Sequence, residues 1–166
     1  MRLFICAVVL TAVTLVSGMA VVSAQQAPAP PAAPAMKLFA SSDEVVAMMA
    51  KAKAERKPDQ AVFSQPIVLL GAYRANLEYR VLPAPPITHE KDIEIFYVVD
   101  GAGTIVTGGT LKDERRANAE NVGGSAIEGG TPQHLAKGDF FIVPSNTPHW
   151  FNQIDGTLVV MSLHVK

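Results

Sequence analysis

Beyond residue 58, the sequence is built from short segments in which apolar and polar residues alternate, and glycine or proline separates these segments. The clearest alternation runs over residues 73–81, and its polar members are Arg74, Asn76, Glu78 and Arg80. A period of two is typical of a β-strand with one buried face and one polar face, and we interpret this polar row as solvated. Many short strands with frequent turns predict an all-β antiparallel sandwich or barrel.

Further strands are expected at several short apolar segments, namely 67–70, 93–99, 103–106, 126–128, 133–136, 140–143, 149–152 and 158–165. Asp100 and Gly101 form a tight-turn pair, so we expect them to end the strand that begins at residue 93. Residues 108–124 are polar, and we expect them to be irregular.

One helix is expected before the strands, within residues 36–58. Ser41 and Glu44 have the spacing of a capping box, and Pro58 stops the helical pattern. The apolar positions that share one helical face are Val45, Met48, Met49 and Ala52. This face is expected to pack against the outside of the β-domain, which takes up residues 59–166.

Residues 1–24 have the pattern of a secretory signal peptide. Arg2 is followed by the apolar run 3–16, and the segment ends with the small residues of Val22-Ser23-Ala24. An uncleaved membrane anchor is the alternative, because residues 3–22 are nearly long enough to span a bilayer.

Residues 25–35 are rich in proline and alanine, which predicts an extended, disordered linker between the signal and the folded domain. A cleaved signal predicts a secreted or periplasmic protein.

The composition excludes several classes of function. The formal net charge of the chain is −1, so it lacks the basic surplus that binding to nucleic acid or to an anionic membrane surface would need. The single cysteine, Cys6, lies in the signal segment. The mature chain is therefore expected to have no disulfide, no cysteine nucleophile and no cysteine-ligated zinc.

Glu94 is the most unusual residue of the expected strands, because its neighbours on both faces are apolar. A buried carboxylate is costly unless it is paired, protonated or bound to a metal, whereas an exposed strand end would make Glu94 unremarkable. His89 lies five residues earlier, and His149 follows a proline-rich turn beside Trp150 and Phe151. Two histidines and a carboxylate suit Fe(II), Mn(II), Zn(II) or Ni(II).

Two segments resemble the sequence motifs of the cupin family. Residues 88–101, THEKDIEIFYVVDG, resemble the first cupin motif, and residues 138–152, GDFFIVPSNTPHWFN, resemble the second. Two such motifs in order within one small domain are a specific signal. The resemblance spans roughly residues 66–165 and implies a double-sheet jelly-roll β-barrel. In metal-binding cupins these motifs hold one divalent metal, which maps onto His89, Glu94 and His149.

The sequence departs from this pattern at three positions. Ile87 stands where the first motif has an additional histidine, and it shares a strand face with His89, so we expect it to face the site without ligating. Asn146 replaces a glycine of the second motif and can adopt the same left-handed turn. The asparagine that ends the second motif comes one residue earlier than in the cupin pattern, at Asn152. The resemblance therefore implies a two-histidine, one-carboxylate ligand set.

Other polar residues are weaker candidates. His134 is expected to be exposed on an edge strand, and His164 on the last strand is either a spare ligand or a solvent-facing residue. Arg115 and Arg116 on the long loop are most simply surface charges, and an anionic-substrate lid is the alternative.

Two functions remain open. The protein is either a metal-dependent enzyme of the oxygenase or isomerase/lyase type, acting on a small organic molecule, or a non-catalytic module that binds a small ligand or the metal itself. In both cases we expect a small-molecule partner, no nucleic acid, and no membrane once the signal is cleaved. A homodimer is compatible with the sequence.

We predict that the signal is cleaved after Ala24, because small residues at positions 22 and 24 form the cleavage site. Intact-mass measurement of the exported protein should give a chain that begins at Gln25. A mass that still includes residues 1–24 would identify a membrane anchor instead.

Overall fold

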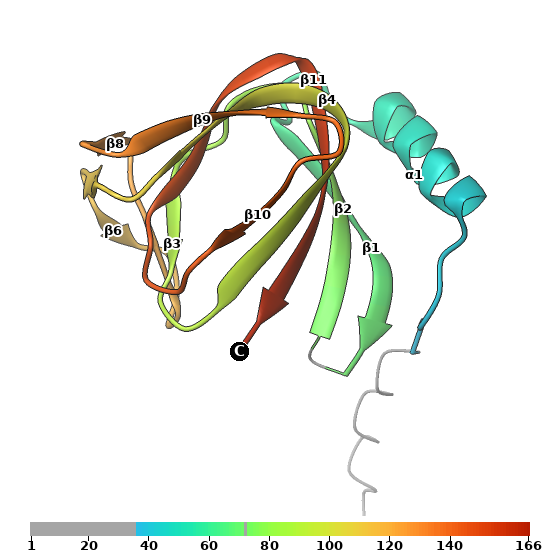
Figure 1. Ribbon diagram of the computed structural model, residues 1–166, viewed down its shortest axis with the longest axis horizontal. Coiled ribbons are helices and arrows are strands. Elements are labelled where there is room, and N and C mark those ends of the chain that lie inside the picture. Colours follow the sequence, from blue (N-terminus) through green and yellow to red (C-terminus); the bar gives the residue numbers. More distant parts are fainter. Residues whose placement is uncertain (1–35, 72) are drawn as a thin grey trace, which may run out of the picture. The chain divides into compact units, whose positions relative to one another are not determined.

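The structure is a computed structural model that describes residues 36–71 and 73–166. The signal and the linker expected at residues 1–35 lie outside the described residues. Within the described part of the chain, no helix is long and apolar enough to cross a membrane. In residues 36–71 and 73–166, one helix is followed by eleven antiparallel strands, in agreement with the expected all-β class (Figure 1).

The helix is α1 (Ser42–Glu55), and the strands are β1 (Val62–Leu70), β2 (Tyr73–Arg80), β3 (Ile87–His89), β4 (Ile93–Thr107), β5 (Thr110–Lys112), β6 (Arg115–Arg116), β7 (Asn121–Gly123), β8 (Ala126–Glu128), β9 (Thr131–Ala136), β10 (Phe140–Val143) and β11 (His149–Val165). Nine strands form one sheet, in which β1-β2-β11-β3-β7-β6 are neighbours and β4 pairs with β9, β10 and β11. Strands β5 and β8 form a second, two-stranded sheet.

Helix α1 begins as its sequence predicts. The Ser41 hydroxyl accepts a hydrogen bond from the Glu44 N–H, and the Glu44 carboxylate accepts one from the Ser41 N–H, so the capping box is confirmed. Val45, Met48 and Met49 pack against a small apolar cluster of Ile67, Leu77 and Val159. The helix therefore covers the outer face of β1, β2 and β11.

Strands β4 and β11 are longer than the sequence predicts. Each was expected as two strands, but each continues as one bent strand, and the two pair along most of their lengths. Asp100-Gly101 does not close a hairpin. Gly101 has φ +79°, and a Cβ there would lie 1.9 Å from the Thr157 carbonyl oxygen, so only glycine permits this close crossing of β11. Gly156, with φ +76°, lies at the corresponding bend of β11.

The segment expected to be irregular, residues 108–124, contains three short strands. Of these, β7 matters for the site, because it pairs with β3 and places Asn121 opposite His89. The turn before β11 is also bonded to the end of β3, because the Asn146 N–H donates to the His89 carbonyl oxygen at 2.7 Å. Asn146 has φ +58°, which confirms the left-handed turn expected where the motif has glycine.

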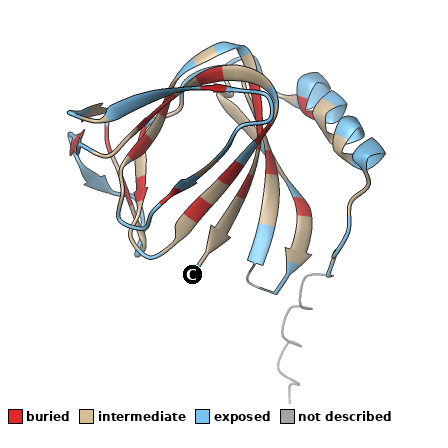
Figure 2. Cartoon of the chain, in the orientation of Figure 1, coloured by how far each residue is buried: buried red, intermediate tan, exposed pale blue. Residues whose placement is uncertain are grey.

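The main core lies on the inner face of the curved sheet. Its buried side chains come mostly from β4 and β11, as Figure 2 shows, and they are Phe96, Val98, Ile105, Leu135, Val143, Phe151, Leu158 and Val160. Phe96 stacks on Phe141 with the ring centroids 4.7 Å apart. One end of the inner space is thus filled with apolar side chains.

The inner part of the polar row of β2 faces this interior, so the interpretation as a solvated face was wrong for Glu78 and Arg80, whereas Arg74 is exposed as expected. Glu78 and Arg80 are each only 12% exposed and form an ion pair. The Glu78 carboxylate also accepts a hydrogen bond from Ser162 Oγ at 2.9 Å, and the Arg80 guanidinium lies 4.1 Å from the ring centre of Phe151. The alternation was identified correctly, but the apolar face of β2 packs against α1 and the polar face turns inward.

We predict that Glu78→Ala lowers the free energy of unfolding by about 3 kcal/mol, because it leaves the Arg80 guanidinium buried without its carboxylate. Urea unfolding measures the loss. Glu128→Ala is the matched control, since Glu128 pairs with Lys112 at 3.9 Å on the exposed surface, and it should cost less than about 1 kcal/mol. Equal effects of the two variants would contradict a structural role for the inner pair.

Candidate metal centre

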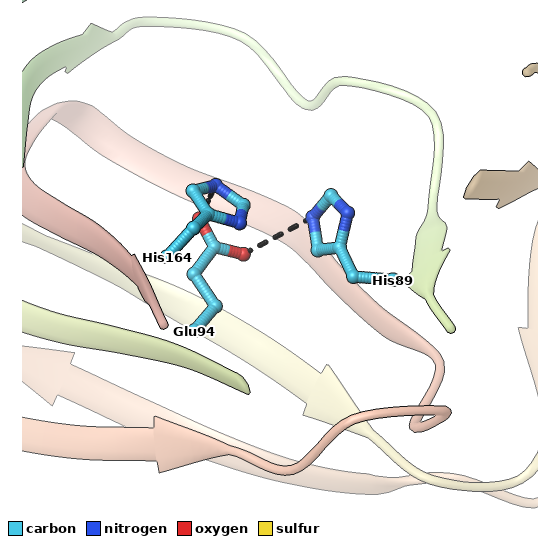
Figure 3. Close-up of side chains that lie close together, drawn as sticks. All are labelled: His89, Glu94 and His164. Atoms are coloured by element: carbon cyan, nitrogen blue, oxygen red, sulfur yellow. Dashed lines mark ion pairs between the residues drawn. The ribbon is translucent and has the colours of Figure 1, made fainter. Parts of the chain in front are cut away.

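Three histidines surround the carboxylate of Glu94. The Nε2 atoms of His89 and His149 lie 3.3 Å and 3.2 Å from Glu94 Oε2, and the Nε2 atom of His164 lies 3.2 Å from Glu94 Oε1. Figure 3 shows His89 and His164 on the two sides of the carboxylate. One ligand atom from each of His89, Glu94 and His164 lies within 4.8 Å of the other two.

Each of these residues is placed by a different part of the sheet. His89 ends β3, and Glu94 lies at the start of β4. The Glu94 side chain is on the same face of β4 as the core residue Phe96. His149 begins β11, whereas His164 lies near the other end of the same strand, directly opposite Glu94 in the β4–β11 register. The two bent strands therefore bring both ends of β11 to one carboxylate.

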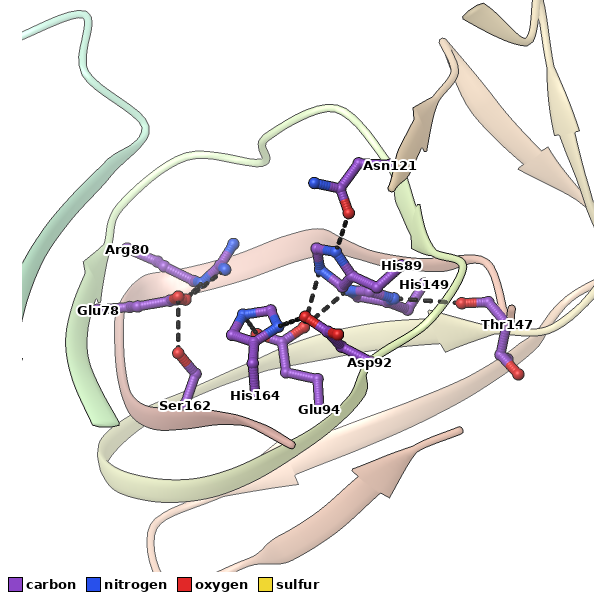
Figure 4. Close-up of polar contacts among 10 residues, drawn as sticks. All are labelled: Glu78, Arg80, His89, Asp92, Glu94, Asn121, Thr147, His149, Ser162 and His164. Carbon is purple, nitrogen blue, oxygen red and sulfur yellow. Dashed lines mark hydrogen bonds and ion pairs between the residues drawn. The ribbon is translucent and has the colours of Figure 1, made fainter. Parts of the chain in front are cut away.

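An oxygen lies behind each imidazole ring (Figure 4). The Nδ1 atom of His89 lies 2.6 Å from Asn121 Oδ1, that of His149 lies 3.3 Å from the Thr147 carbonyl oxygen, and that of His164 lies 3.7 Å from Asp92 Oδ2. The Asn121 and Thr147 oxygens lie within hydrogen-bond distance and orient the rings of His89 and His149, whereas Asp92 lies beyond that distance from His164. An Nδ1–H that donates to such an oxygen leaves the Nε2 lone pair directed at the centre of the cluster. This is the arrangement in which proteins hold metal-ligating histidines.

The charges of the cluster depend on one another. The Glu94 side chain is only 5% exposed, so burial by itself would raise the pKa of its carboxyl. Hydrogen bonds from His149, His164 and His89 outweigh burial and hold the pKa of Glu94 well below its usual range. Burial lowers the pKa of His89, but its contacts with Glu94 and Asn121 raise that pKa above the ordinary value overall.

The residues fit a divalent metal ion. A neutral imidazole carries a single N–H, so it cannot donate both to the oxygen behind it and to Glu94. When Nδ1–H of His89 or His149 donates to the oxygen behind it, the Nε2 atom that faces Glu94 either takes up a second proton, which places positive charge in a buried site, or directs its lone pair at a cation. His89, Glu94 and His164 offer ligand atoms close enough for one ion, with the nitrogen and oxygen ligands that Fe(II), Mn(II), Zn(II) and Ni(II) accept. His149 lies beside this group, with its Nε2 atom 3.2 Å from the Glu94 carboxylate.

The cluster opens on one side into a cavity of about 440 Å³. His89 and His164 form part of the cavity wall, and the other lining residues are Tyr73, Arg74, Asp92, Asn121 and Lys166. His149 is almost fully buried behind them, with 4% of its side chain exposed, whereas the His164 side chain is 31% exposed. A small molecule in this cavity would therefore lie directly against the histidine cluster.

The three residues chosen from the sequence, His89, Glu94 and His149, lie together in the structure. His134 does not join them: its side chain is 60% exposed, as expected, and it pairs with Asp155. Ile87 is the register partner of His149 and so lies beside the cluster without ligating. Arg116 forms a surface ion pair with Glu90.

For His164, the sequence left two alternatives open, a spare metal ligand or a solvent-facing residue. The structure puts it in the cluster. Its signal in the sequence was the alternation with Val160 and Ser162, two residues that are both fully buried. That alternation indicates a shared face, but only the pairing of β11 with β4 shows that Glu94 lies opposite.

Comparison with solved structures shows the same fold in a distant protein and a weaker likeness to another. The DMSP lyase DddQ from Ruegeria pomeroyi DSS-3 is 17% identical, with a TM-score of 0.51, and the match covers 80% of this chain and 67% of that one. KdgF from Halomonas sp. is 18% identical, with a TM-score of 0.46, and the match covers 67% of this chain and 86% of that one. At these identities the likeness concerns the fold alone.

A comparison with curated proteins gives no match. The family model described as cupin, in contrast, matches residues 67–165, which are more than half of the chain and include all four residues of the histidine–glutamate cluster. The matched residues also contain strands β2 to β11 and both sequence motifs. The chain belongs to the cupin family.

Proposed function

We propose that this cupin binds one divalent metal ion through His89, Glu94, His149 and His164, and that it is an exported enzyme acting on a small organic molecule. The observation that carries the metal site is the convergence of three Nε2 atoms on one buried carboxylate, while an oxygen faces each Nδ1. Export rests on the signal pattern of residues 1–24.

The cavity favours a catalytic site over a closed structural one. Structural metal sites are fully enclosed by protein ligands, whereas catalytic sites keep an open position. Here His89 and His164 line a cavity large enough for a small organic molecule. When bound, the metal would supply Lewis-acid chemistry or an oxygen-binding position, as in isomerases and lyases or in oxygenases. The residues of this chain would hold and orient the substrate beside it.

A non-catalytic cupin module is the second candidate. The volume of about 440 Å³ would suit a site that only binds a small ligand as well as it suits a catalytic site. Elemental analysis of protein purified from its natural compartment tests the proposal first. Close to one equivalent of a redox-active or Lewis-acidic metal supports the enzyme, and absence of metal leaves the binding module.

We predict that His149→Ala lowers metal affinity at least about 100-fold without unfolding the domain, because the apolar core does not include His149. Isothermal titration calorimetry with Zn(II) or Mn(II) measures the affinity, and circular dichroism checks the fold. The matched control is His134→Ala, which removes an exposed histidine outside the cluster and should leave the affinity unchanged. Unchanged metal content in His149→Ala would contradict the site.

We further predict that Ile87→His restores the metal affinity that His164→Ala removes. Ile87 lies opposite His149 in the strand register, so a histidine there faces the same centre. Without metal, Ile87→His should lower the free energy of unfolding by about 1–3 kcal/mol, because a polar ring replaces an apolar contact. Metal should offset this loss.

The control for this pair is Ile93→His combined with His164→Ala. Ile93 lies next to Glu94 on β4, so its side chain points to the opposite face of the strand. Titration of both double variants with the same metal compares them directly. If Ile87→His recovers no more affinity than Ile93→His does, position 87 does not face the metal.

A further inference from the structure

The inner wall that β2 contributes is polar from the cavity mouth to the core. Because strand residues alternate between faces, Arg74 and Asn76 lie on the same side of β2 as Glu78 and Arg80. The two deeper residues are held by each other and by Ser162. Among the described residues, the structure records no hydrogen bond or ion pair for the side chains of the two outer residues, Arg74 and Asn76. The deeper half of this wall is therefore held by protein groups, whereas Arg74 is exposed and its side chain is accessible to a ligand.

Arg74 lines the same cavity as the metal-site histidines His89 and His164. A second cation, Lys166, also lines it, but its ammonium group lies 3.0 Å from the carboxylate of Glu120. The acid in the lining is Asp92, whose Oδ2 atom faces His164 Nδ1 at 3.7 Å. The guanidinium of Arg74 is thus the charged group of this wall that has no described counterion.

A guanidinium presents a planar fork of N–H donors that matches the two oxygens of a carboxylate or phosphate. Such a group at the mouth of a cavity that already contains a metal site recognises one end of a ligand, while the metal takes the other. The volume of about 440 Å³ limits that ligand to a small molecule.

We propose that the ligand of this cavity is a small organic oxyanion, and that Arg74 binds its carboxylate or phosphate group. This inference rests on the proposed function in placing the reacting end of the ligand at the metal. Recognition of the charged end of the ligand depends on Arg74 alone. Arg74 is then a specificity-determining residue that separates anionic from neutral molecules of equal size.

The test is isothermal titration of the purified protein, with and without Zn(II), with three probes: succinate, inorganic phosphate, and succinamide as the uncharged control. Succinate or phosphate should bind to the parent protein, and succinamide should bind at least about 10-fold more weakly. Preference for succinate assigns a carboxylate ligand, and preference for phosphate assigns a phosphorylated one.

Arg74→Gln should weaken binding of the preferred anion about 10- to 100-fold. Arg74→Lys should retain part of the affinity, because an ammonium group keeps the charge and loses the fork. The matched control is Arg115→Gln, which removes the same kind of charge from an exposed residue outside this cavity and should change nothing. Melting curves confirm that each variant is folded.

The proposal is overturned if Arg74→Gln binds the anion as tightly as the parent, if Arg115→Gln weakens it equally, or if neither anion binds at millimolar concentration. Elemental analysis of the same samples separates this result from the metal site. Arg74-dependent binding in a protein that takes up no metal would refute only the metalloenzyme. Metal uptake with anion binding that ignores Arg74 would refute only the present inference.

Discussion

The burial of one carboxylate organises the functional end of this molecule. Glu94 is on the core side of β4, where a charge is tolerated only if other groups compensate for it. Three imidazoles supply that compensation, and hydrogen-bonding oxygens from Asn121 and Thr147 lie behind the rings of His89 and His149 and fix their directions. Strand β7 and the turn before β11 matter to function because they deliver these oxygens. The proposed metal ion would complete the same arrangement without excess protons.

The convergence depends on two strands that bend. An extended strand as long as β11 would keep its first and last residues far apart, yet His149 and His164 both reach Glu94. Register shifts between β4 and β11, together with glycines at positive φ, allow the pair to curve around the apolar core. The core of aromatic and branched side chains therefore fixes the geometry of the site at a distance from it.

The interior is divided into an apolar end and a polar end. Phe96, Phe151 and their neighbours fill one part, and Glu78 and Arg80 mark the boundary, where the guanidinium lies against an aromatic ring. Beyond that boundary the wall carries Arg74 and the histidines that face the cavity. A charged group as deeply placed as Glu78 or Arg80 is costly unless it is paired, and these two pair with each other. This pair stabilises the fold, whereas Arg74 is exposed at the cavity, where we propose that it binds the ligand.

The sequence alone determined the all-β class, the capped helix and the grouping of His89, Glu94 and His149, because the periods of apolar residues and the two cupin motifs are local features of the chain. Tertiary structure decided which side of each alternating strand became the interior. Period-two patterning shows that residues share a face, but it does not show what that face meets. In β2 the helix took the apolar face, so the polar row turned inward. His164 entered the cluster for the same reason: only the long-range register of β11 on β4 places it opposite Glu94.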